Sequence, residues 1–426
     1  MNPFLSILLW STYLLSLYFS VFWLLIFIEH APGFFEKPKR KACKYPLVTI
    51  IVPAKNEEQT ITATLQSVIE LDYPTDKLEI IAVCNATTDR SMDRARTFIS
   101  MNPKHNIRLI YSPKPGKGRA LNQALSISHG EFFACLDADS AVDSGSLQKM
   151  LAVFEEQDNK LTIVTPAMKI RSPSNIYQRL QRIEYLLSIF IGRLMSKLDC
   201  LYVAPGPFSL YRTRTIIKLG GFDENNITED MEIAYRCQRE HLKITQCPDA
   251  WVTTVGPTTA KTLYAQRNRW FKGGLLNAIK YKDLLANPRY GDFGFLQMSI
   301  NFMLFFFSAT AILFFSYYMI WPFFTGFWRL YLIGFDVWPL LTHLSLNFSP
   351  LYIDIEKVFI ANFMMALTLG FIWIAHKNAN ESLRQTRWTI LPYIFVYYLA
   401  LSLVALAVFA ETAIGKKPQW EEKKNS

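Results

Sequence analysis

The sequence predicts an α/β protein in which a doubly wound, Rossmann-like cytoplasmic domain is joined to transmembrane and interfacial α-helices. Hydrophobic residues make up 51% of the 426 residues and charged residues only 19%, which is more apolar than is usual for a soluble protein. The long apolar runs lie in the first 30 residues and beyond residue 292. Strand-like and helix-like patterns alternate between them. The chain therefore has room for one large soluble domain and several membrane spans.

A transmembrane helix is expected at the N-terminus, within residues 1–30. Residues 5–28 are apolar or hydroxylic and form a run long enough to cross a bilayer. A cleaved signal peptide is the alternative, but no positive charge precedes the run and no small-residue cleavage site follows it. The linker 31–46 is basic, so the positive-inside rule places residue 40 onward in the cytoplasm. We expect an integral protein of the plasma or inner membrane.

The central domain is expected to cover residues 47–258. Its strands are predicted from apolar, β-branched runs at 47–54, 78–83, 107–111 and 131–139. Helices are predicted between them from amphipathic spacing, at 60–71, 88–99 and 119–128. This order favours a parallel, doubly wound sheet, which binds ligands at the carboxyl ends of its strands.

The C-terminal part is expected to be helical and membrane-associated. Residues 259–292 are predicted to form interfacial helices. The stretch 176–198 is similar, although a core helix with a charged face explains it equally well. Residues 293–412 are expected to hold three or four spans, with clear apolar runs at 293–320, 355–375 and 390–409. A polar tail, 413–426, follows.

The stretch 321–346 is ambiguous, because it is apolar but interrupted by charges and by Gly and Pro. If it does not cross the membrane, the basic loop 376–387 falls in the cytoplasm, as the charge rule prefers. If it does cross, that loop lies outside. The first alternative is slightly favoured.

Charge and cysteine usage exclude two classes of protein. The net charge is +10, but the basic residues cluster beside apolar segments and no nucleic-acid-binding module is visible, so no nucleic-acid partner is expected. The six cysteines form no CxxC pair and no close Cys/His cluster. They are expected to be reduced, mostly buried thiols, with no structural zinc site.

Acidic residues follow the fourth predicted strand. Asp137 and Asp139 lie two residues apart, so they can point into one cleft and share a divalent cation. A hard cation bridges phosphate oxygens and helps a diphosphate to leave. An acidic loop without function is the alternative reading, and the position after a buried strand argues against it.

Polar turns also follow the other strands. PAKNEE, at 53–58, and CNATTD, at 84–89, lie where a nucleotide would bind to such a sheet. GKGRALN, at 116–122, places Lys117 in a Gly-flanked turn that opens a helix, which suits a phosphate. The full P-loop spacing is absent, so an ATPase is excluded. Ordinary turn chemistry and N-capping are the alternatives.

Two further motifs carry candidate chemistry. Thr228-Glu229-Asp230 opens a helix, either as an N-cap or as the site of a general base that deprotonates an acceptor hydroxyl. QRNRW, at 266–270, places Gln266, Arg269 and Trp270 on one helical face. Arg can clamp a pyrophosphate and Trp can stack on a sugar. An interfacial helix with an aromatic anchor is the alternative.

The ordered set of these motifs resembles the membrane-bound members of glycosyltransferase family 2, which include cellulose, chitin, hyaluronan and poly-N-acetylglucosamine synthases. The resemblance covers about residues 47–278 and the flanking spans. It implies a GT-A fold, a UDP-sugar donor, a Mg²⁺ or Mn²⁺ ion and a cytoplasmic active site.

The resemblance also implies a role for each matching residue. Asp230, with Glu229 beside it, corresponds to the catalytic base, Asp139 to the metal ligand, and Asp137 to a contact with the metal and the donor. The remaining positions are expected to bind the donor nucleotide (Pro53, Glu57, Asn85, Lys117), to hold its diphosphate (Gln266, Arg269) or to face the acceptor (Trp270, Gly206, Phe208).

The sequence departs from the family pattern at Asn85, where the family usually has an Asp that contacts uracil. An Asn can still bond to a base edge, but the charge is gone. The single N-terminal span also differs from the longer synthases, which puts a secretion channel in doubt.

The expected function is inverting transfer of a sugar from a nucleotide-sugar to a growing β-linked polysaccharide. Single-sugar transfer to a lipid, as in ceramide glucosyltransferases, is the alternative, and a non-catalytic transporter or scaffold is a remote one. The expected partners are the donor, a glycan or lipid acceptor and the lipid bilayer, and an accessory subunit is a further candidate.

Overall fold

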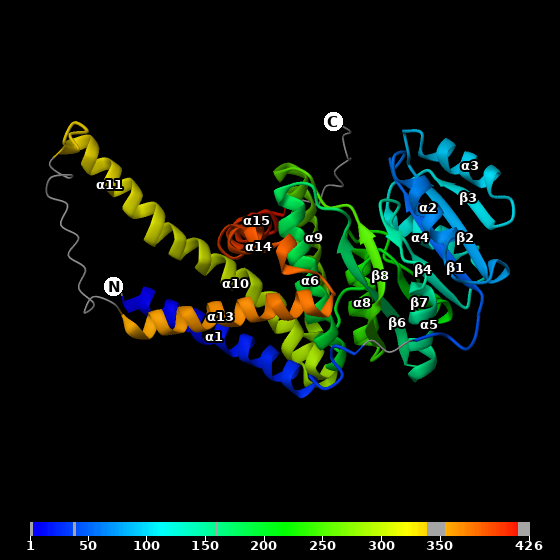
Figure 1. Cartoon of the computed structure of the whole chain (residues 1–426), viewed down its shortest axis with the longest axis horizontal. Coiled ribbons are helices and arrows are strands. Elements are labelled where there is room, and N and C mark those ends of the chain that lie inside the picture. The colour runs from blue at the N-terminus through cyan, green and yellow to red at the C-terminus, as the bar shows by residue number, and fades with distance from the viewer. Residues whose placement is uncertain (1–2, 37–39, 159, 339–353, 416–426) are drawn as a thin grey trace.

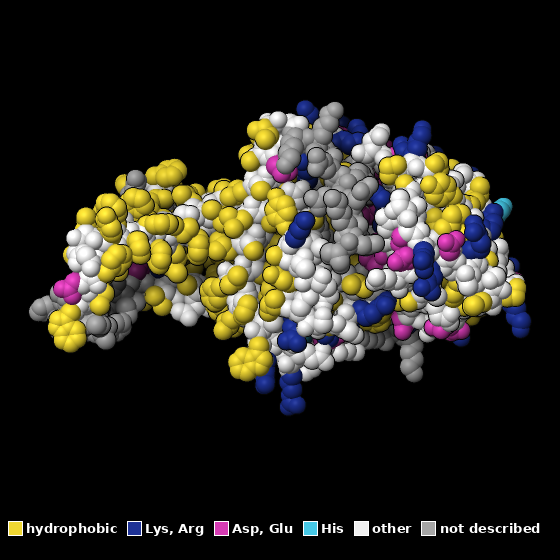
Figure 2. All heavy atoms as spheres, turned by 90° about the horizontal axis from the view of Figure 1, so that it is seen from above, with side chains coloured by type: hydrophobic (Ala, Val, Ile, Leu, Met, Phe, Trp, Pro, Cys, Tyr) yellow, Lys and Arg dark blue, Asp and Glu magenta, His cyan; other side chains and the backbone are white. Residues whose placement is uncertain are grey.

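The computed structural model describes residues 3–36, 40–158, 160–338 and 354–415. An α/β domain lies at one end of the molecule and long helices extend from it at the other (Figure 1). Figure 2 shows hydrophobic side chains gathered over the helical end and charged side chains over the α/β domain. The apolar and charged residues that are separated along the sequence are therefore also separated in space.

A single eight-stranded sheet, in the order β3-β2-β1-β4-β7-β6-β8-β5, forms the centre of the α/β domain. The first four strands are parallel and match the predicted ones: β1 Val48–Ala54, β2 Leu78–Asn85, β3 Asn106–Ser112 and β4 Phe132–Cys135. The others are β5 Ala141–Val142, β6 Leu161–Ile170, β7 Ser209–Arg212 and β8 Lys243–Thr254. β7 runs antiparallel to β4 and β6. The sheet is thus mixed rather than fully parallel.

Helices cover both faces of this sheet, as the doubly wound prediction requires. Alternate residues of β1 point to opposite faces, because side chains along a strand alternate. Ile50 packs in a core with α2 Ile61–Ile69, α3 Ser91–Met101 and α5 Ser146–Glu156. Ile51 packs in the opposite core with α4 Lys117–Leu125, α7 Thr213–Lys218 and α8 Glu229–Arg239.

Two long helices connect the α/β domain to the apolar helices. α6 Ile176–Lys197 packs on β6 and β8, and Phe190 joins it to α13. α9 Ala260–Lys280 contacts α8 on one side and α15 on another. Both helices therefore lie between the α/β domain and the apolar helices and contact both.

Among the described residues, four helical stretches are long and apolar enough to cross a membrane by length and composition: Pro3–Glu29 (α1), Phe293–Leu332, Ile355–Asn378 (α13) and Arg387–Ala413. The second contains α10 Met298–Phe315 and α11 Trp321–Leu332, and the fourth contains α14 Arg387–Pro392 and α15 Tyr398–Ala413. Figure 1 shows α14 and α15 close to end-on, whereas α1 and α13 run across the picture.

The ambiguous stretch begins as helix. α11 continues the line of α10 away from the α/β domain (Figure 1), while residues 339–346 lie outside the described residues, as do 37–39 of the basic linker and 416–426 of the polar tail. The loop after α13 lies against the α/β domain, since Lys169 Nζ is 3.0 Å from Glu381 Oε1. Arg193 Nη1 also donates to Asn378 Oδ1 at 2.8 Å. This loop therefore contacts the α/β domain, and whether residues 321–346 cross a membrane stays a prediction.

Candidate active site

Lys117, Asp137 and Glu229 meet at the carboxyl end of the central strands. Lys117 begins α4, Asp137 follows β4, and Glu229 begins α8. Lys117 Nζ lies 2.5 Å from Asp137 Oδ1 and 3.3 Å from Glu229 Oε1. Burial alone would lower the pKa of Lys117, but the charges of Asp137 and Glu229 outweigh it and hold that pKa well above its usual value. Lys117 is therefore a permanent cation, suited to an anionic ligand.

Asp230 stands beside this cluster, in the first turn of α8. Its Oδ1 accepts a hydrogen bond from the Met231 amide at 2.9 Å. Burial and the charge of Glu229 raise the pKa of Asp230 to about 6, against the opposing charges of Lys117 and Arg269. A carboxylate with a pKa close to neutral pH is well matched to general-base work. The neighbouring Glu229 Oε2 is buried and has no hydrogen-bond partner among the described residues.

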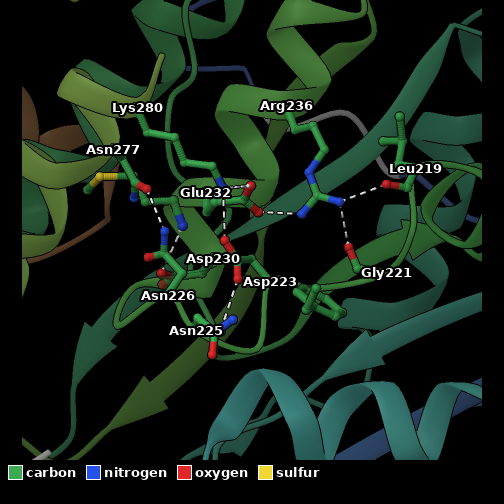
Figure 3. Close-up of polar contacts among 12 residues, drawn as sticks. Leu219, Gly221, Asp223, Asn225, Asn226, Asp230, Glu232, Arg236, Asn277 and Lys280 are labelled. Carbon is green, nitrogen blue, oxygen red and sulfur yellow. Dashed lines mark hydrogen bonds and ion pairs between the residues drawn. The ribbon is translucent and has the colours of Figure 1, made fainter. Parts of the chain in front are cut away.

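Thr228 does not act as the N-cap that the alternative reading expected. It occupies the N-cap position of α8, but its side chain makes no capping bond. Its hydroxyl donates to Asn226 Oδ1 at 3.2 Å and accepts from Asn277 Nδ2 at 3.1 Å. Asn226 Nδ2 also donates to Asn277 Oδ1 at 2.7 Å. These bonds tie the Thr228-Glu229-Asp230 turn to α9, and Figure 3 shows Asn226 and Asn277 facing each other.

Asp139 offers a carboxylate two residues beyond Asp137. Its Oδ1 accepts from Ser140 Oγ at 3.0 Å and from Thr254 Oγ1 at 3.4 Å. Within the described ranges, no group of three or more His, Cys, Asp or Glu residues is placed to hold a metal. Mg²⁺ is commonly held by one or two carboxylates together with substrate phosphates. The residues present therefore fit a cation that binds together with a diphosphate.

The loop before β7 closes tightly over the charged cluster. A Cβ atom on Gly206 would lie 2.5 Å from Lys117 Nζ and 2.9 Å from Asp137 Oδ2, so glycine is required for this approach. Phe208 has a φ of 63°, and its amide donates to Cys135 O at 2.5 Å. Its ring is fully buried in the sheet core. Phe208 thus supports the loop from below, and the acceptor contact expected of it stays a prediction.

Asn85 is hydrogen-bonded through both ends of its side-chain amide to the backbone of the loop that leads into α4. Its Nδ2 donates to Lys114 O at 2.8 Å, and its Oδ1 accepts from the Gly116 amide at 2.9 Å. A carboxylate could not donate the first of these bonds. This gives a physical reason for Asn at this position, while the predicted contact with a nucleotide base stays a prediction.

The first polar turn is held mainly by hydrogen bonds to the turn after β2 and to the start of α3. The Glu57 amide donates to Ser91 Oγ at 2.7 Å, and Glu57 Oε2 accepts from Thr60 Oγ1 at 2.8 Å. Pro53 lies near the end of β1, opposite Val83 of β2. Both residues lie at the strand ends where a nucleotide was expected.

The QRNRW motif of α9 approaches the same region. Arg269 Nη1 donates to Ile227 O at 3.4 Å, directly before Thr228. Gln266 Oε1 accepts from Gln181 Nε2 of α6 at 2.7 Å. Trp270 lies under the guanidinium of Arg267, with 4.3 Å between Arg267 Cζ and the ring centroid. The structure therefore brings the tip of α8 and the motif of α9 together.

Sequence reasoning missed the buried ionic contacts that hold α9. Arg267, which is only 2% exposed, binds both oxygens of Glu184 at 2.9 and 2.6 Å. Tyr397 donates to Glu184 Oε2 at 2.7 Å. The spacing of apolar Leu263 and Arg267 on one helical face could have indicated that Arg267 is buried.

A second group of missed residues joins α8 to the end of α9. Glu232 Oε1 accepts from Lys280 Nζ at 3.0 Å and from Tyr281 OH at 2.5 Å, and Glu232 also pairs with Arg236 (Figure 3). Two turns before the end of α9, Gly273 packs directly on Thr228. The adjacent Gly273-Gly274 pair was the signal in the sequence for a close approach here.

Comparisons with known proteins agree with this architecture. Residues 49–220 match the family described as Glycosyl transferase family 2. The chain is 29% identical over 247 residues to a beta-monoglucosyldiacylglycerol synthase from Nostoc sp. and 30% identical over 243 residues to a poly-beta-1,6-N-acetyl-D-glucosamine synthase from Staphylococcus aureus. These alignments cover 58% and 56% of this chain but 53% and 57% of the relatives. The chain thus spans about half the length of the curated relatives it matches.

A solved structure extends the likeness in fold. A mannosyltransferase from Pyrobaculum calidifontis, in complex with GDP-Man and Mn2+, superposes with a TM-score of 0.59 at 19% identity, over 96% of this chain and 99% of that one. At this identity the likeness concerns the fold alone. It confirms the predicted GT-A-like, Rossmann-type sheet with its helices.

Proposed function

We propose that the protein is a membrane glycosyltransferase. The premise is that residues 49–220 form a family 2 glycosyltransferase domain. In this proposal it transfers a sugar from a nucleotide-sugar, UDP-linked, to a growing β-linked glycan, with inversion, on the cytoplasmic side of the membrane. The observation that carries the proposal is the cluster of Lys117, Asp137, Glu229 and Asp230 at the strand ends, with Arg269 close to Asp230.

The proposed chemistry is a single in-line displacement. Asp230 takes the proton of the acceptor hydroxyl as that oxygen attacks the anomeric carbon and the bond to the diphosphate breaks. Lys117 and Arg269 offset the negative charge that grows on the leaving diphosphate. A Mg²⁺ or Mn²⁺ ion held by Asp139 and Asp137 would supply further neutralisation of that charge. An α-linked donor would then give a β-linked product.

Lipid glycosylation is the second candidate, and two observations favour it. The chain is similar to a glucosyldiacylglycerol synthase, and α9, which carries QRNRW, packs directly on the apolar helix α15. An acceptor could therefore reach the site from the bilayer. Purified protein incubated with a radiolabelled donor and membrane lipids separates the two candidates. A high-molecular-weight product supports the glycan acceptor, and a single-sugar lipid supports the lipid acceptor.

The test of the catalytic assignment is Asp230→Asn. This change keeps the side-chain shape but removes the base, so donor binding should persist while transfer is lost. Glu240→Gln, at the exposed end of the same helix, is the matched control and should transfer normally. Near-wild-type transfer by Asp230→Asn would remove Asp230 from the base role.

The metal assignment is tested by Asp139→Ala. Metal-dependent donor binding should be abolished in this variant, whereas Asp143→Ala, a nearby exposed carboxylate, should retain it. Unchanged metal dependence in Asp139→Ala would refute the assignment.

A further inference from the structure

A cavity of about 500 Å³ lies between the start of α6 and the loop that joins α13 to α14, and none of the candidate active-site residues lines it. Its lining includes four arginines, Arg179, Arg182, Arg384 and Arg387, together with Thr386 and Trp388. Four guanidinium groups around one hollow are unusual, because like charges repel unless an anion lies between them. None of these residues takes part in the proposed transfer.

Most of the positive charge in this cavity is uncompensated. Arg182 pairs with Glu381, but Lys169 shares the same carboxylate, with its Nζ 3.0 Å from Glu381 Oε1. Within the part of the chain that the structure describes, Arg179, Arg384 and Arg387 form no ion pair. The cavity therefore presents three guanidinium groups to a ligand, and guanidinium forks match the oxygens of a phosphate.

The loop that carries two of these arginines is held in place. His376 Nε2 lies 2.7 Å from Thr386 Oγ1, and Lys169 Nζ donates to Ala379 O at 2.8 Å. Both contacts tie the loop to ordered elements, α13 and β6. The guanidinium groups of Arg384 and Arg387 are thus carried by a loop that is hydrogen-bonded to regular secondary structure.

The cavity also lies where the apolar helices begin. The loop connects two candidate spans, Ile355–Asn378 and Arg387–Ala413. Trp388 is 80% exposed and Leu391, one turn further along the helix, is 59% exposed. Trp is enriched at the level of lipid headgroups, and basic pockets beside transmembrane helices bind anionic headgroups. A ligand with a phosphate and acyl chains would meet arginines first and apolar side chains next.

We propose that this cavity binds the phosphate of an anionic membrane phospholipid. The guanidinium groups of Arg179, Arg384 and Arg387 hold the phosphate oxygens, and the acyl chains lie along α14 beside Trp388. The shared chemistry is a phosphate, which free inorganic phosphate also offers, but the apolar surface next to the arginines favours a lipid. This site is independent of the donor and acceptor sites of the proposed function.

The test uses the full chain in detergent, titrated separately with short-chain phosphatidylglycerol, short-chain phosphatidylcholine and inorganic phosphate. Binding is read from the thermal unfolding midpoint and from native mass spectrometry. Phosphatidylglycerol should bind and raise the midpoint, and the other two should do neither. Arg384→Gln/Arg387→Gln should weaken phosphatidylglycerol binding by about tenfold or more, because two charge-assisted contacts are lost.

A matched control separates the site from net charge. Arg94→Gln/Arg214→Gln removes the same charge from exposed positions on α3 and α7 and should bind phosphatidylglycerol as the wild type does. Since Arg384 and Arg387 form no ion pair with any residue that the structure describes, neutralising them should leave the fold intact, and the midpoint without lipid checks this. Equal weakening in both double variants, unchanged binding in Arg384→Gln/Arg387→Gln, or no binding at all would overturn the site. Inorganic phosphate binding as tightly as the lipid would overturn the lipid assignment.

Discussion

Gly273→Ala should disable sugar transfer at a cost of at most about 2 kcal/mol in stability. A Cβ atom on Gly273 would lie 2.3 Å from Thr228 Oγ1, 2.4 Å from Thr228 Cγ2 and 2.9 Å from Thr228 Cβ. Rotating the Thr228 side chain cannot relieve all three contacts. α9 and the Thr228-Glu229-Asp230 turn must therefore separate by roughly 1 Å, because close-packed interiors leave no spare volume.

The two effects on stability oppose each other. Overpacking costs about 1–3 kcal/mol, whereas replacing Gly by Ala inside a helix gains about 1 kcal/mol. The net loss is therefore about 0–2 kcal/mol. Transfer is more sensitive, because a misplacement of about 1 Å at a catalytic group can cost on the order of a hundredfold in rate. Transfer rate is thus the decisive measurement.

Gly274→Ala is the matched control on the same helix. Its added Cβ would lie 3.7 Å from Met231 Sδ, an ordinary contact, so it should gain up to about 1 kcal/mol and keep its transfer rate. Both variants are assayed by incorporation of radiolabel from the UDP-sugar that the wild type uses best, and by thermal unfolding. If Gly273→Ala transfers as fast as Gly274→Ala, packing of α9 on Thr228 does not place the base.

Three further predictions follow from the same contacts. Since the pKa of Asp230 is raised to about 6, the base becomes protonated and initial rates should fall as the pH drops through about 6. Glu229→Gln removes a charge that raises this pKa, so the midpoint of the pH–rate profile should move to lower pH. A midpoint that did not move downward would contradict the effect of the Glu229 charge on Asp230. Glu184→Gln leaves the buried Arg267 without its carboxylate and should cost about 3–5 kcal/mol in the free energy of unfolding, measured by denaturant titration. A loss no greater than that of the exposed control Glu240→Gln would show that the Arg267–Glu184 pair is dispensable. Gly206→Ala pushes a Cβ against Lys117 and Asp137 and should weaken equilibrium donor binding by about tenfold. Gly145→Ala, whose Cβ would make only ordinary contacts, 3.5 Å to Lys149 and 4.0 Å to Asp143, should bind the donor normally.

Local patterns were sufficient to predict the four parallel strands and their helices. β1, β2 and β4 are mostly apolar and almost wholly buried, and β3, at the edge of the sheet, is partly exposed but still mainly apolar, so all four are recognisable without knowledge of their neighbours. β5, β6 and β8 were not predicted, and neither was the antiparallel strand β7. It is four residues long, and its pairing with β4 and β6 depends on segments far away in the chain. Strand pairing between distant segments cannot be predicted from the periodicity of one short stretch.

The sequence by itself determined the chemical inventory of the candidate site. Carboxylates after β4 and at the start of α8, a lysine at the start of α4, and the Arg and Trp of QRNRW were all visible, because polar residues at strand ends and helix starts stand out from apolar runs.

Only the tertiary structure decided how these groups are held. It showed Asn85 bonded to the loop before Lys117, Phe208 buried beneath the site, and Arg267 paired with Glu184. Each of these facts depends on contacts between residues that are distant in the chain. The physical reason is that burial and hydrogen-bond partners arise from packing, which a linear pattern of residue types does not specify.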